Sequence, residues 1–183
     1  MSDSLREVVE RLGLLLRAEE RRAAAELGIQ PVQLQVLAYV DRCNRYSDNP
    51  AAVAEYLGAT KGTISQSIQR LQEKELLVSD RDELDRRRVH LALTTAGRAL
   101  LRAHQDVDRL DAALVRLKRR SGARGVLEEL LRSLQGVQEQ LSFGHCRSCH
   151  HFQQQGRVYR CGLFDERLLR DDLDRICREH EAR

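Results

Sequence analysis

Tryptophan is absent from this 183-residue chain, and only two prolines and one methionine occur in it. Aromatic residues make up 4% of the sequence, which argues against a protein that stacks unpaired nucleic-acid bases on aromatic side chains. The scarcity of proline, together with 42% hydrophobic residues, is typical of an ordered and mostly helical protein. A chain of this length can bury a core and suits one main domain with an appendage.

A long apolar run is also missing. The run LGLLL at 12–16 is short and is flanked by Arg11 and Arg17, so it predicts neither a membrane span nor a signal peptide. We therefore expect a cytoplasmic protein with no membrane partner, in which structural disulfides are disfavoured and the five cysteines need another role. The net charge is only +3, so any attraction to a polyanion must come from local patches.

Residues 49–97 carry the most positional information. Asn49 is a good helix N-cap and Pro50 suits the first helical position, where a missing N–H costs nothing. Gly58 can take the left-handed conformation that ends this helix, and Thr60 can cap the next one. The pattern predicts a helix-turn-helix.

The second helix of this pair has two different faces. Ile64, Ile68 and Leu71 share one stripe and predict the buried face. No acidic residue lies between Thr60 and Arg70, and the outward side chains offer amides, hydroxyls and positive charge, which can contact base edges and phosphates. The candidate DNA-binding residues here are Thr60, Lys61, Thr63, Ser65, Gln66, Gln69 and Arg70. The alternative is an ordinary solvated face, which in an acid-rich chain would normally carry Glu or Asp.

A hairpin follows this helix. Val89, Leu91 and Leu93 alternate with polar residues and predict a strand, with residues 77–81 as its partner. The tip between them supplies three more candidate DNA-binding residues, Asp85, Arg86 and Arg87. A charged tip can simply prevent strand pairing with another molecule. After a recognition helix, contact with the minor groove or phosphates is the stronger interpretation.

The order of LGATKGTISQSIQRLQEKELL, DxxDRR, an alternating strand and LTxxG resembles the MarR family of bacterial regulators. The likeness is dense over 49–100 and loose over 30–40. It implies a winged helix-turn-helix in which Asp85 and Arg87 hold the wing tip together and reach the minor groove, and a dimer formed by terminal helices. Glu75 departs from the family, which usually has glycine there, so we expect the backbone to avoid a positive φ and the helix exit to change slightly.

Helices are also predicted outside this region. Residues 4–26 form an amphipathic pattern that stops at Gly28, and Pro31 opens a helix that reaches Cys43. A long helix runs from 98 to about 118, glycines at 122 and 125 break it, and another apolar helix follows. The outer helices are not needed to complete a winged domain, so their apolar faces predict a homodimer that reads a palindromic site. An intrachain three-helix cluster is the weaker alternative.

Five cysteines remain to be explained. Cys43 is either a reactive thiol near a dimer interface or a small buried hydrophobe, and the latter is the more common role of a lone cysteine. Cys146, Cys149, Cys161 and Cys177 have the spacing C-x2-C, x11, C, x15, C, which predicts a four-thiolate metal site. Residues 157–161 predict a strand, and a final helix from near 164 would place Cys177 and His180 on its inner face. His145, His150, His151 and His180 are reserve ligands, with His180 foremost.

Zinc and an iron-sulfur cluster make the same demand on sequence, since both accept four cysteines. A tail with few apolar residues needs a bound metal to stabilise its fold, which favours structural zinc. A redox-sensing iron-sulfur cluster is the alternative. Four free buried cysteines with no metal are the weaker alternative to either site.

The sequence thus predicts a mainly α protein with a small β-wing. Its expected parts are an N-terminal dimerisation helix (1–28), a winged helix-turn-helix (29–97), C-terminal dimerisation helices (98–142) and a cysteine-rich metal module (143–183). We expect a transcription regulator, a repressor, that binds double-stranded DNA as a homodimer. A small molecule or a change at the metal site would release it from the DNA. A redox or metal enzyme is a weaker reading, because four cysteines leave no open metal position and no nucleophile with a base is recognisable. The third hypothesis is that the tail recruits a protein partner.

Overall fold

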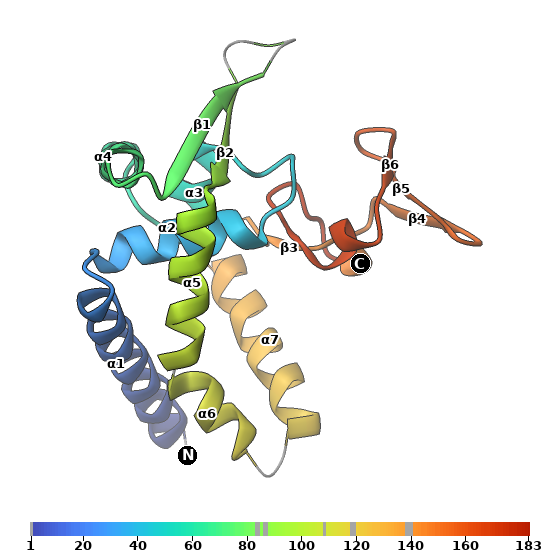
Figure 1. Ribbon diagram of the computed structural model, residues 1–183. Coiled ribbons are helices and arrows are strands. Elements are labelled where there is room, and N and C mark those ends of the chain that lie inside the picture. Colours follow the sequence, from blue (N-terminus) through green and yellow to red (C-terminus); the bar gives the residue numbers. More distant parts are fainter. Residues whose placement is uncertain (1, 83–84, 86–87, 108, 118–119, 138–140) are drawn as a thin grey trace.

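The computed structural model describes residues 2–82, 85, 88–107, 109–117, 120–137 and 141–183 (Figure 1). Its helices are α1 (Ser2–Glu26), α2 (Pro31–Arg42), α3 (Pro50–Leu57), α4 (Lys61–Glu73), α5 (Thr95–Val107), α6 (Arg109–Val115) and α7 (Arg120–Val137). Its strands are β1 (Leu77–Arg81), β2 (Val89–Leu93), β3 (Gly144–His145), β4 (Phe152–Gln155), β5 (Val158–Cys161), β6 (Glu166–Leu168) and β7 (Ile176–Cys177). Two 3₁₀ turns, η1 (Cys146–Ser148) and η2 (Asp171–Asp174), lie in the tail.

Helices α2, α3 and α4 and the hairpin β1–β2 form a winged helix, as the sequence predicted. Asn49 caps α3 by accepting a hydrogen bond from the Ala52 N–H at 3.0 Å, and Gly58 ends it at φ 60°. Thr60 caps α4 by accepting from the Thr63 N–H at 3.2 Å. Strand β1 pairs with β2 in antiparallel register, with Leu77 opposite Leu93. The main core lies under these elements and includes Leu37, Tyr39, Val53, Ile64 and Leu71.

The exit from α4 differs from the prediction. Glu75 takes a left-handed backbone conformation at φ 57°, although it is not glycine. The reversal from helix to strand requires it, because the Leu76 N–H returns to the Leu71 carbonyl at 2.9 Å. The Thr94 hydroxyl also donates to the Glu75 carbonyl at 2.7 Å, so the tertiary contacts hold a conformation that the residue itself disfavours.

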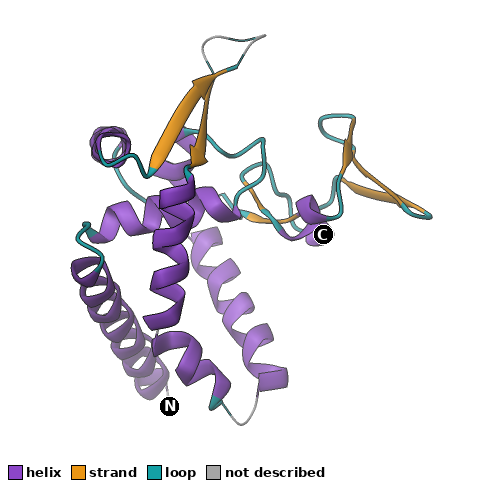
Figure 2. Cartoon of the chain, in the orientation of Figure 1, coloured by secondary structure: helices purple, strands orange, loops and turns teal. Residues whose placement is uncertain are grey.

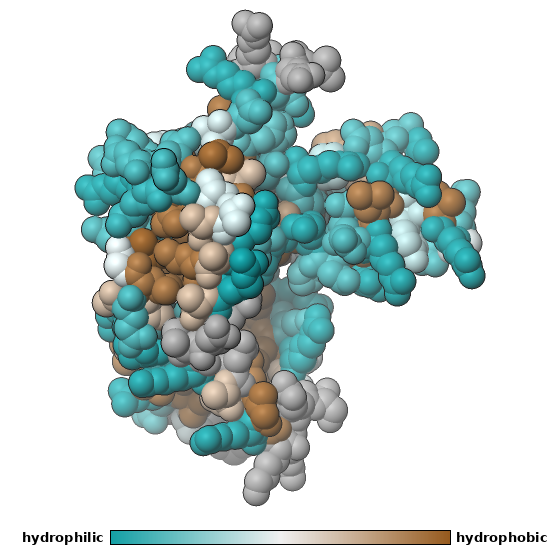
Figure 3. Space-filling model, in the orientation of Figure 1, coloured by the Kyte–Doolittle hydropathy of each residue, from teal (hydrophilic) through white to brown (hydrophobic). Residues whose placement is uncertain are grey.

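The helices below the winged domain have unpartnered apolar residues. Figure 2 shows α1, α5, α6 and α7 extending away from the wing, and in Figure 3 apolar residues reach the surface between α1, α2 and α5. The large hydrophobic side chains that are exposed on α1 and α7 are Leu5, Val8, Leu12, Leu14, Leu15, Leu16, Val126, Leu127, Leu131, Leu134 and Val137. None of the described helices is both long and apolar enough to cross a bilayer.

One helix boundary was wrong. The helix predicted from 98 to about 118 corresponds to α5 and α6, and position 108 between them lies outside the described residues. Gly122 and Gly125 do not interrupt a helix but lie inside α7. A Cβ added at either position would meet no other atom within 4 Å. A helix interior tolerates isolated glycines at a cost of about 1 kcal/mol each when neighbouring residues are good helix formers.

The tail contains two small sheets in place of the predicted final helix. Strands β4, β5 and β6 form an antiparallel sheet, and Gly156 turns β4 into β5 at φ 60°. Beyond it the Asp172 carboxylate accepts the Leu169 N–H at 2.7 Å, a local bond that competes with an α-helix. Strand β7 then pairs with β3 and places Ile176 in the main core, so pairing and burial override the helical pattern.

Candidate functional site

The outward face of α4 is fully available to a ligand. All seven candidate residues on it are exposed. Gln69 differs from Gln66, because its amide donates to the Glu73 carboxylate at 3.1 Å. Thr63 lies against the cap, with its hydroxyl 2.9 Å from that of Thr60. Helix α4 therefore presents amides, hydroxyls and positive charge on a surface free of acids until its last turn.

The hairpin rises beside α4 (Figure 1). His90 lies on β2 opposite Asp80, near the tip end of the strand pair. The His90 ring lies between two carboxylates, with Nδ1 2.7 Å from Asp48 and Nε2 3.3 Å from Asp82. The hydrogen bond to Asp48 raises the pKa of His90 above its ordinary value. Burial raises the pKa of Asp48, and His90 acts in the opposite direction. His90 thus connects the wing to the loop before α3.

The tip of the hairpin is described only in part. The Asp85 N–H donates to the Asp82 carboxylate at 2.7 Å, and the Asp85 carbonyl accepts from the Arg88 N–H at 2.8 Å. The main chain at Asp85 therefore helps to close the turn. Arg86 and Arg87 lie outside the described residues.

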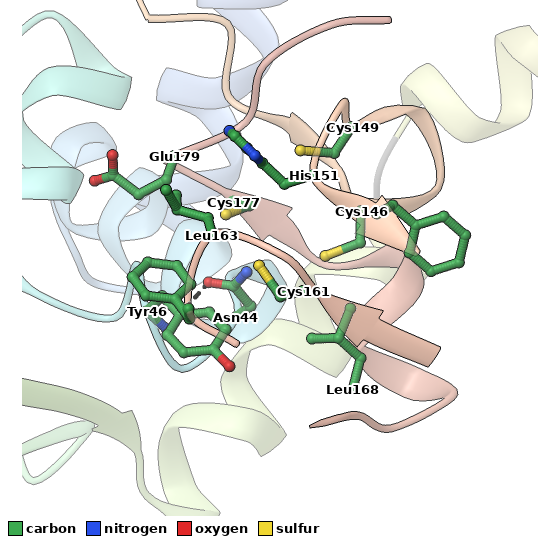
Figure 4. A pocket seen from close by; sticks show the side chains of 12 residues that line it. Asn44, Tyr46, Cys146, Cys149, His151, Cys161, Leu163, Leu168, Cys177 and Glu179 are labelled. Carbon is green, nitrogen blue, oxygen red and sulfur yellow. Dashed lines mark hydrogen bonds between the residues drawn. The ribbon is translucent and has the colours of Figure 1, made fainter. Parts of the chain in front are cut away.

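The four tail cysteines surround one small cavity. Figure 4 shows Cys146, Cys149, Cys161 and Cys177 around it. Cys146 begins η1 and Cys149 follows it, whereas Cys161 ends β5 and Cys177 ends β7. The cavity has a volume of about 10 Å³, roughly the space for a single water-sized particle. All four are free thiols, and three of them are buried. Burial raises the pKa of Cys146 to about 12, with smaller contributions in the same direction from the other three cysteines.

The cysteines are gathered but are not yet in a ligand geometry. In the described part of the chain, no three His, Cys, Asp or Glu side chains are spaced to hold one metal ion. Closing a four-thiolate site would therefore need side-chain movements around the cavity.

The reserve ligand His180 lies elsewhere. Its ring packs on Gly144, where an added Cβ would lie 2.4 Å from it, so β3 can pass only because residue 144 has no side chain. Its Nδ1 is 2.7 Å from the Ser142 hydroxyl and its Nε2 is 3.0 Å from that of Ser148. The predicted helix that would have turned His180 inward is absent. His151 lines the cavity instead (Figure 4).

Cys43 is not part of this cavity. Its side chain is buried in the main core, its thiol lies 3.5 Å from the Val40 carbonyl, and burial raises its pKa to about 12. A thiol that resists ionisation is a poor nucleophile, so the structure agrees with a small buried hydrophobe.

Residues 27–88 match the MarR family. The HTH-type transcriptional repressor NicR of Pseudomonas putida is 35% identical over 102 residues, which are 53% of this chain. The match spans 65% of NicR, just under two thirds of its length.

Solved MarR-like structures share the fold. S. aureus MepR in complex with DNA has a TM-score of 0.60 at 20% identity, over 71% of this chain and 94% of that one. CouR from Rhodococcus jostii RHA1, bound to p-coumaroyl-CoA, has a TM-score of 0.57 at 24% identity, over 74% of this chain and 92% of that one. Each is covered almost completely, so about a quarter of this chain extends beyond the MarR-like fold that they share.

Sequence reasoning missed two residues of the site, Asn44 and Ser47. Both are buried in the loop between α2 and α3, and Asn44 lines the cysteine cavity. No spacing rule connects this loop with cysteines a hundred residues later. The only available signal was that the loop CNRYSDN holds small polar residues next to a helix N-cap.

Proposed function

We propose that this protein is a DNA-binding transcription regulator that acts in the cytoplasm as a homodimer on a palindromic operator. The observation that carries the proposal is the exposed face of α4, which offers amides, hydroxyls and a guanidinium with no acid between Thr60 and Arg70. Such groups pair with base edges in the major groove. The wing stands beside α4 and can approach an adjacent groove or phosphates. MepR, which shares the fold, is recorded in complex with DNA.

A homodimer would cover the exposed apolar faces of α1 and α7. Single exposed leucines are common, but rows of them along two helices are typical of an interaction surface. A two-fold dimer would also present two α4 helices to the two half-sites of a palindrome.

Repression and release by a small molecule are supported by the relatives. NicR is named a repressor, and CouR is recorded with a CoA ester. In this chain a cavity of about 400 Å³ lies where Leu16, Leu34, Tyr56 and His104 meet, large enough for part of a small ligand. The Ser142 hydroxyl beside the His180 ring donates to the His180 main-chain carbonyl at 2.6 Å, so its proton is not directed at the ring as in an activated nucleophile, and a regulator is preferred to an enzyme.

The four tail cysteines would hold a structural zinc ion. The tail has little core of its own, with Cys146, Leu168 and Leu173 as its only separate cluster of buried residues in the described chain. Small modules with so little apolar burial usually need a metal or disulfides. Four thiolates suit zinc, and an iron-sulfur cluster is the alternative with the same ligands.

The DNA-binding proposal is tested by selecting duplexes from a random pool with the full chain and measuring affinity against salt concentration. We expect a palindromic consensus and an affinity that falls steeply with salt, because Lys and Arg replace counterions on phosphates. Arg87→Ala should make the DNA affinity less dependent on salt concentration. Failure to enrich any sequence would contradict the proposal.

The metal proposal is tested by metal analysis and absorbance of protein purified without oxygen. Each single Cys→Ser change at 146, 149, 161 or 177 should release the ion and unfold the tail, since a site built from separate elements exists only when folded. Cys43→Ser should retain the metal. Loss of the metal in His151→Ala would identify His151 as a ligand, and retention would show that it only lines the cavity. Absorbance in the visible range would indicate an iron-sulfur cluster in place of zinc. Wild-type protein with no stoichiometric metal and five titratable thiols would refute the site.

A further inference from the structure

Asn44 brings a buried polar group from the winged helix to the cysteine cavity. The residue is 2% exposed. Its main-chain N–H donates to the Ile176 carbonyl at 2.9 Å, and its side-chain carbonyl accepts the Tyr46 N–H at 3.1 Å. Because the carbonyl is held in this way, the amide nitrogen points among the sulfurs (Figure 4). That Nδ2 atom has no hydrogen-bond partner.

A buried N–H without an acceptor is costly, and a thiol is a weak acceptor. A thiolate accepts readily, and hydrogen bonds to metal-bound sulfur tune metal sites in proteins. Asn44 and Cys177 line the same cavity, and the main-chain bond from Asn44 to Ile176 holds Asn44 beside the residue that precedes Cys177. A metal-bound Cys177 thiolate would therefore supply the acceptor that the Asn44 amide lacks.

We infer that Asn44 donates a hydrogen bond to the Cys177 thiolate when the tail holds its metal, and that metal loading thereby raises the affinity of the winged helix for DNA. The inference rests on the proposed function, because it requires both a metal site in the tail and DNA binding by α4. It makes the metal a regulator of DNA binding as well as a staple.

The loop 43–49 connects the two sites physically. On the tail side, the Arg178 N–H donates to the Ser47 hydroxyl at 2.8 Å, and the Arg175 guanidinium donates to the Cys43 carbonyl at 3.2 Å. The Tyr46 ring stacks on Phe164 with 4.2 Å between ring centroids. These contacts come from both sides of Cys177 and from the β5–β6 turn, so the fold of the tail sets the path of the loop.

On the DNA-binding side, the end of the same loop holds α3 and the wing. Asn49 is the N-cap of α3. The Asp48 carbonyl accepts the Leu91 N–H of β2 at 2.7 Å, and the Asp48 carboxylate holds His90. A second connection joins Arg178 and Glu55 of α3. Releasing the metal would loosen the loop, and with it the relative placement of α3, α4 and the wing that a DNA site requires.

The test compares DNA affinity of the full chain with bound Zn²⁺ and after removal of the metal by a chelator, using a duplex selected by the metal-loaded protein. We expect removal to weaken binding at least about fivefold, the lower end of usual coupling between sites. Asn44→Asp keeps the acceptor for Tyr46 and removes the donor. It should still take up metal at saturating Zn²⁺, with weaker affinity, and its DNA binding should respond much less to the metal.

Asn49→Asp is the matched control for the metal measurement. It makes the same chemical change five residues later, away from the cysteine cavity, and aspartate still caps α3. Its Zn²⁺ affinity should equal that of wild type. Substitution with Co²⁺ adds a spectroscopic measure, because loss of an N–H···S bond should shift the sulfur-to-cobalt charge-transfer band in Asn44→Asp and not in Asn49→Asp.

Hydrogen exchange of the wild-type protein tests the route even if Asn44→Asp does not fold. Removal of Zn²⁺ should speed exchange at the Asn44 and Leu91 amides, whose acceptors are Ile176 and Asp48, while amides within α2 stay protected. A metal-loaded protein whose DNA affinity and loop exchange do not change on chelation would overturn the inference and leave the proposed function intact. Absence of metal or of DNA binding would instead refute the proposed function.

Discussion

Two glutamines on α4 look alike in sequence but differ in the structure. Gln69 donates to Glu73, whereas Gln66 lies one turn earlier on the exposed face. A glutamine that reads a base must exchange its present partner for the base edge. Gln69 therefore gives up a protein contact on binding, and Gln66 is the better candidate for direct readout.

We expect Gln66→Ala to reduce affinity for the selected duplex by about 1–3 kcal/mol and to relax the preference at one base position. Gln69→Ala should have a smaller effect, because Gln69 must give up its hydrogen bond to Glu73 before it can contact a base. The thermal midpoint should not change in either variant. Competition binding with single-base variants of the duplex measures this, and unchanged specificity in both would assign recognition to another surface.

Glu75 shows how a tertiary contact overrides a residue preference. Its φ of 57° is strained for a residue with a Cβ, and the side chain is exposed. Glu75→Gly should therefore stabilise the protein by up to about 1 kcal/mol, despite the greater entropy of the unfolded glycine chain. Gln72→Gly, inside α4, should destabilise it by about 1 kcal/mol. Urea denaturation of both variants measures the difference. Destabilisation of equal size in both would show that the left-handed conformation carries no strain.

At the level of elements, the wing depends on one histidine. His90 is positioned by Asp48 and Asp82, and the hydrogen bond to Asp48 raises its pKa above the ordinary value of 6.5. A raised pKa means that the folded state binds the proton more tightly than the unfolded chain. The resulting stabilisation is complete below about pH 6.5 and is lost as pH rises through the higher folded pKa.

We therefore expect the wild type to lose a little stability between pH 6 and 8 relative to His90→Gln, which cannot take up the proton. The side chain of His90 is 36% exposed, so the effect should stay below about 1 kcal/mol. Urea midpoints of the two proteins across this range provide the measurement. A difference between them that grows with rising pH would have the wrong sign for this contact.

Gly97 is the glycine of the LTxxG motif, and it lies where the start of α5 meets the backbone just before β1. A Cβ at this position would lie 2.1 Å from the Leu76 carbonyl oxygen, so α5 can begin against β1 only without a side chain. This contact explains why LTxxG contributes to the resemblance: the glycine permits the close approach of two backbones.

At the scale of the whole molecule, the proposed homodimer depends on the exposed leucines of α7. Leu131 is 54% exposed on α7, and Val158 is 48% exposed on β5 of the tail. We expect Leu131→Arg to weaken dimerisation at least about tenfold, since burying a leucine contributes roughly 1.5–3 kcal/mol and arginine would be buried without a partner. Val158→Arg should not affect it. Sedimentation over a range of concentrations measures both, and a monomeric wild type would contradict the proposed dimer.

The sequence alone was sufficient for the winged helix. Its caps, its buried stripe and its alternating strand are local patterns, and Asn49, Gly58, Thr60 and Ile64 all lie where those patterns place them. The candidate surface of α4 followed for the same reason: on a helix, spacing alone determines which side chains share a face. The left-handed Glu75 and the glycines inside α7 were missed because neighbours in space decide those conformations.

The tail shows the limit most clearly. Spacing identified four cysteines, and the structure brings them to one cavity, but only tertiary contacts decided how. Strand β7 is extended because Ile176 is buried in the core of another region and pairs with the chain next to Cys43. That pairing moves His180 away from the sulfurs and brings Asn44 to them. Contacts between residues more than a hundred positions apart depend on the packing of the whole chain, which no local period records.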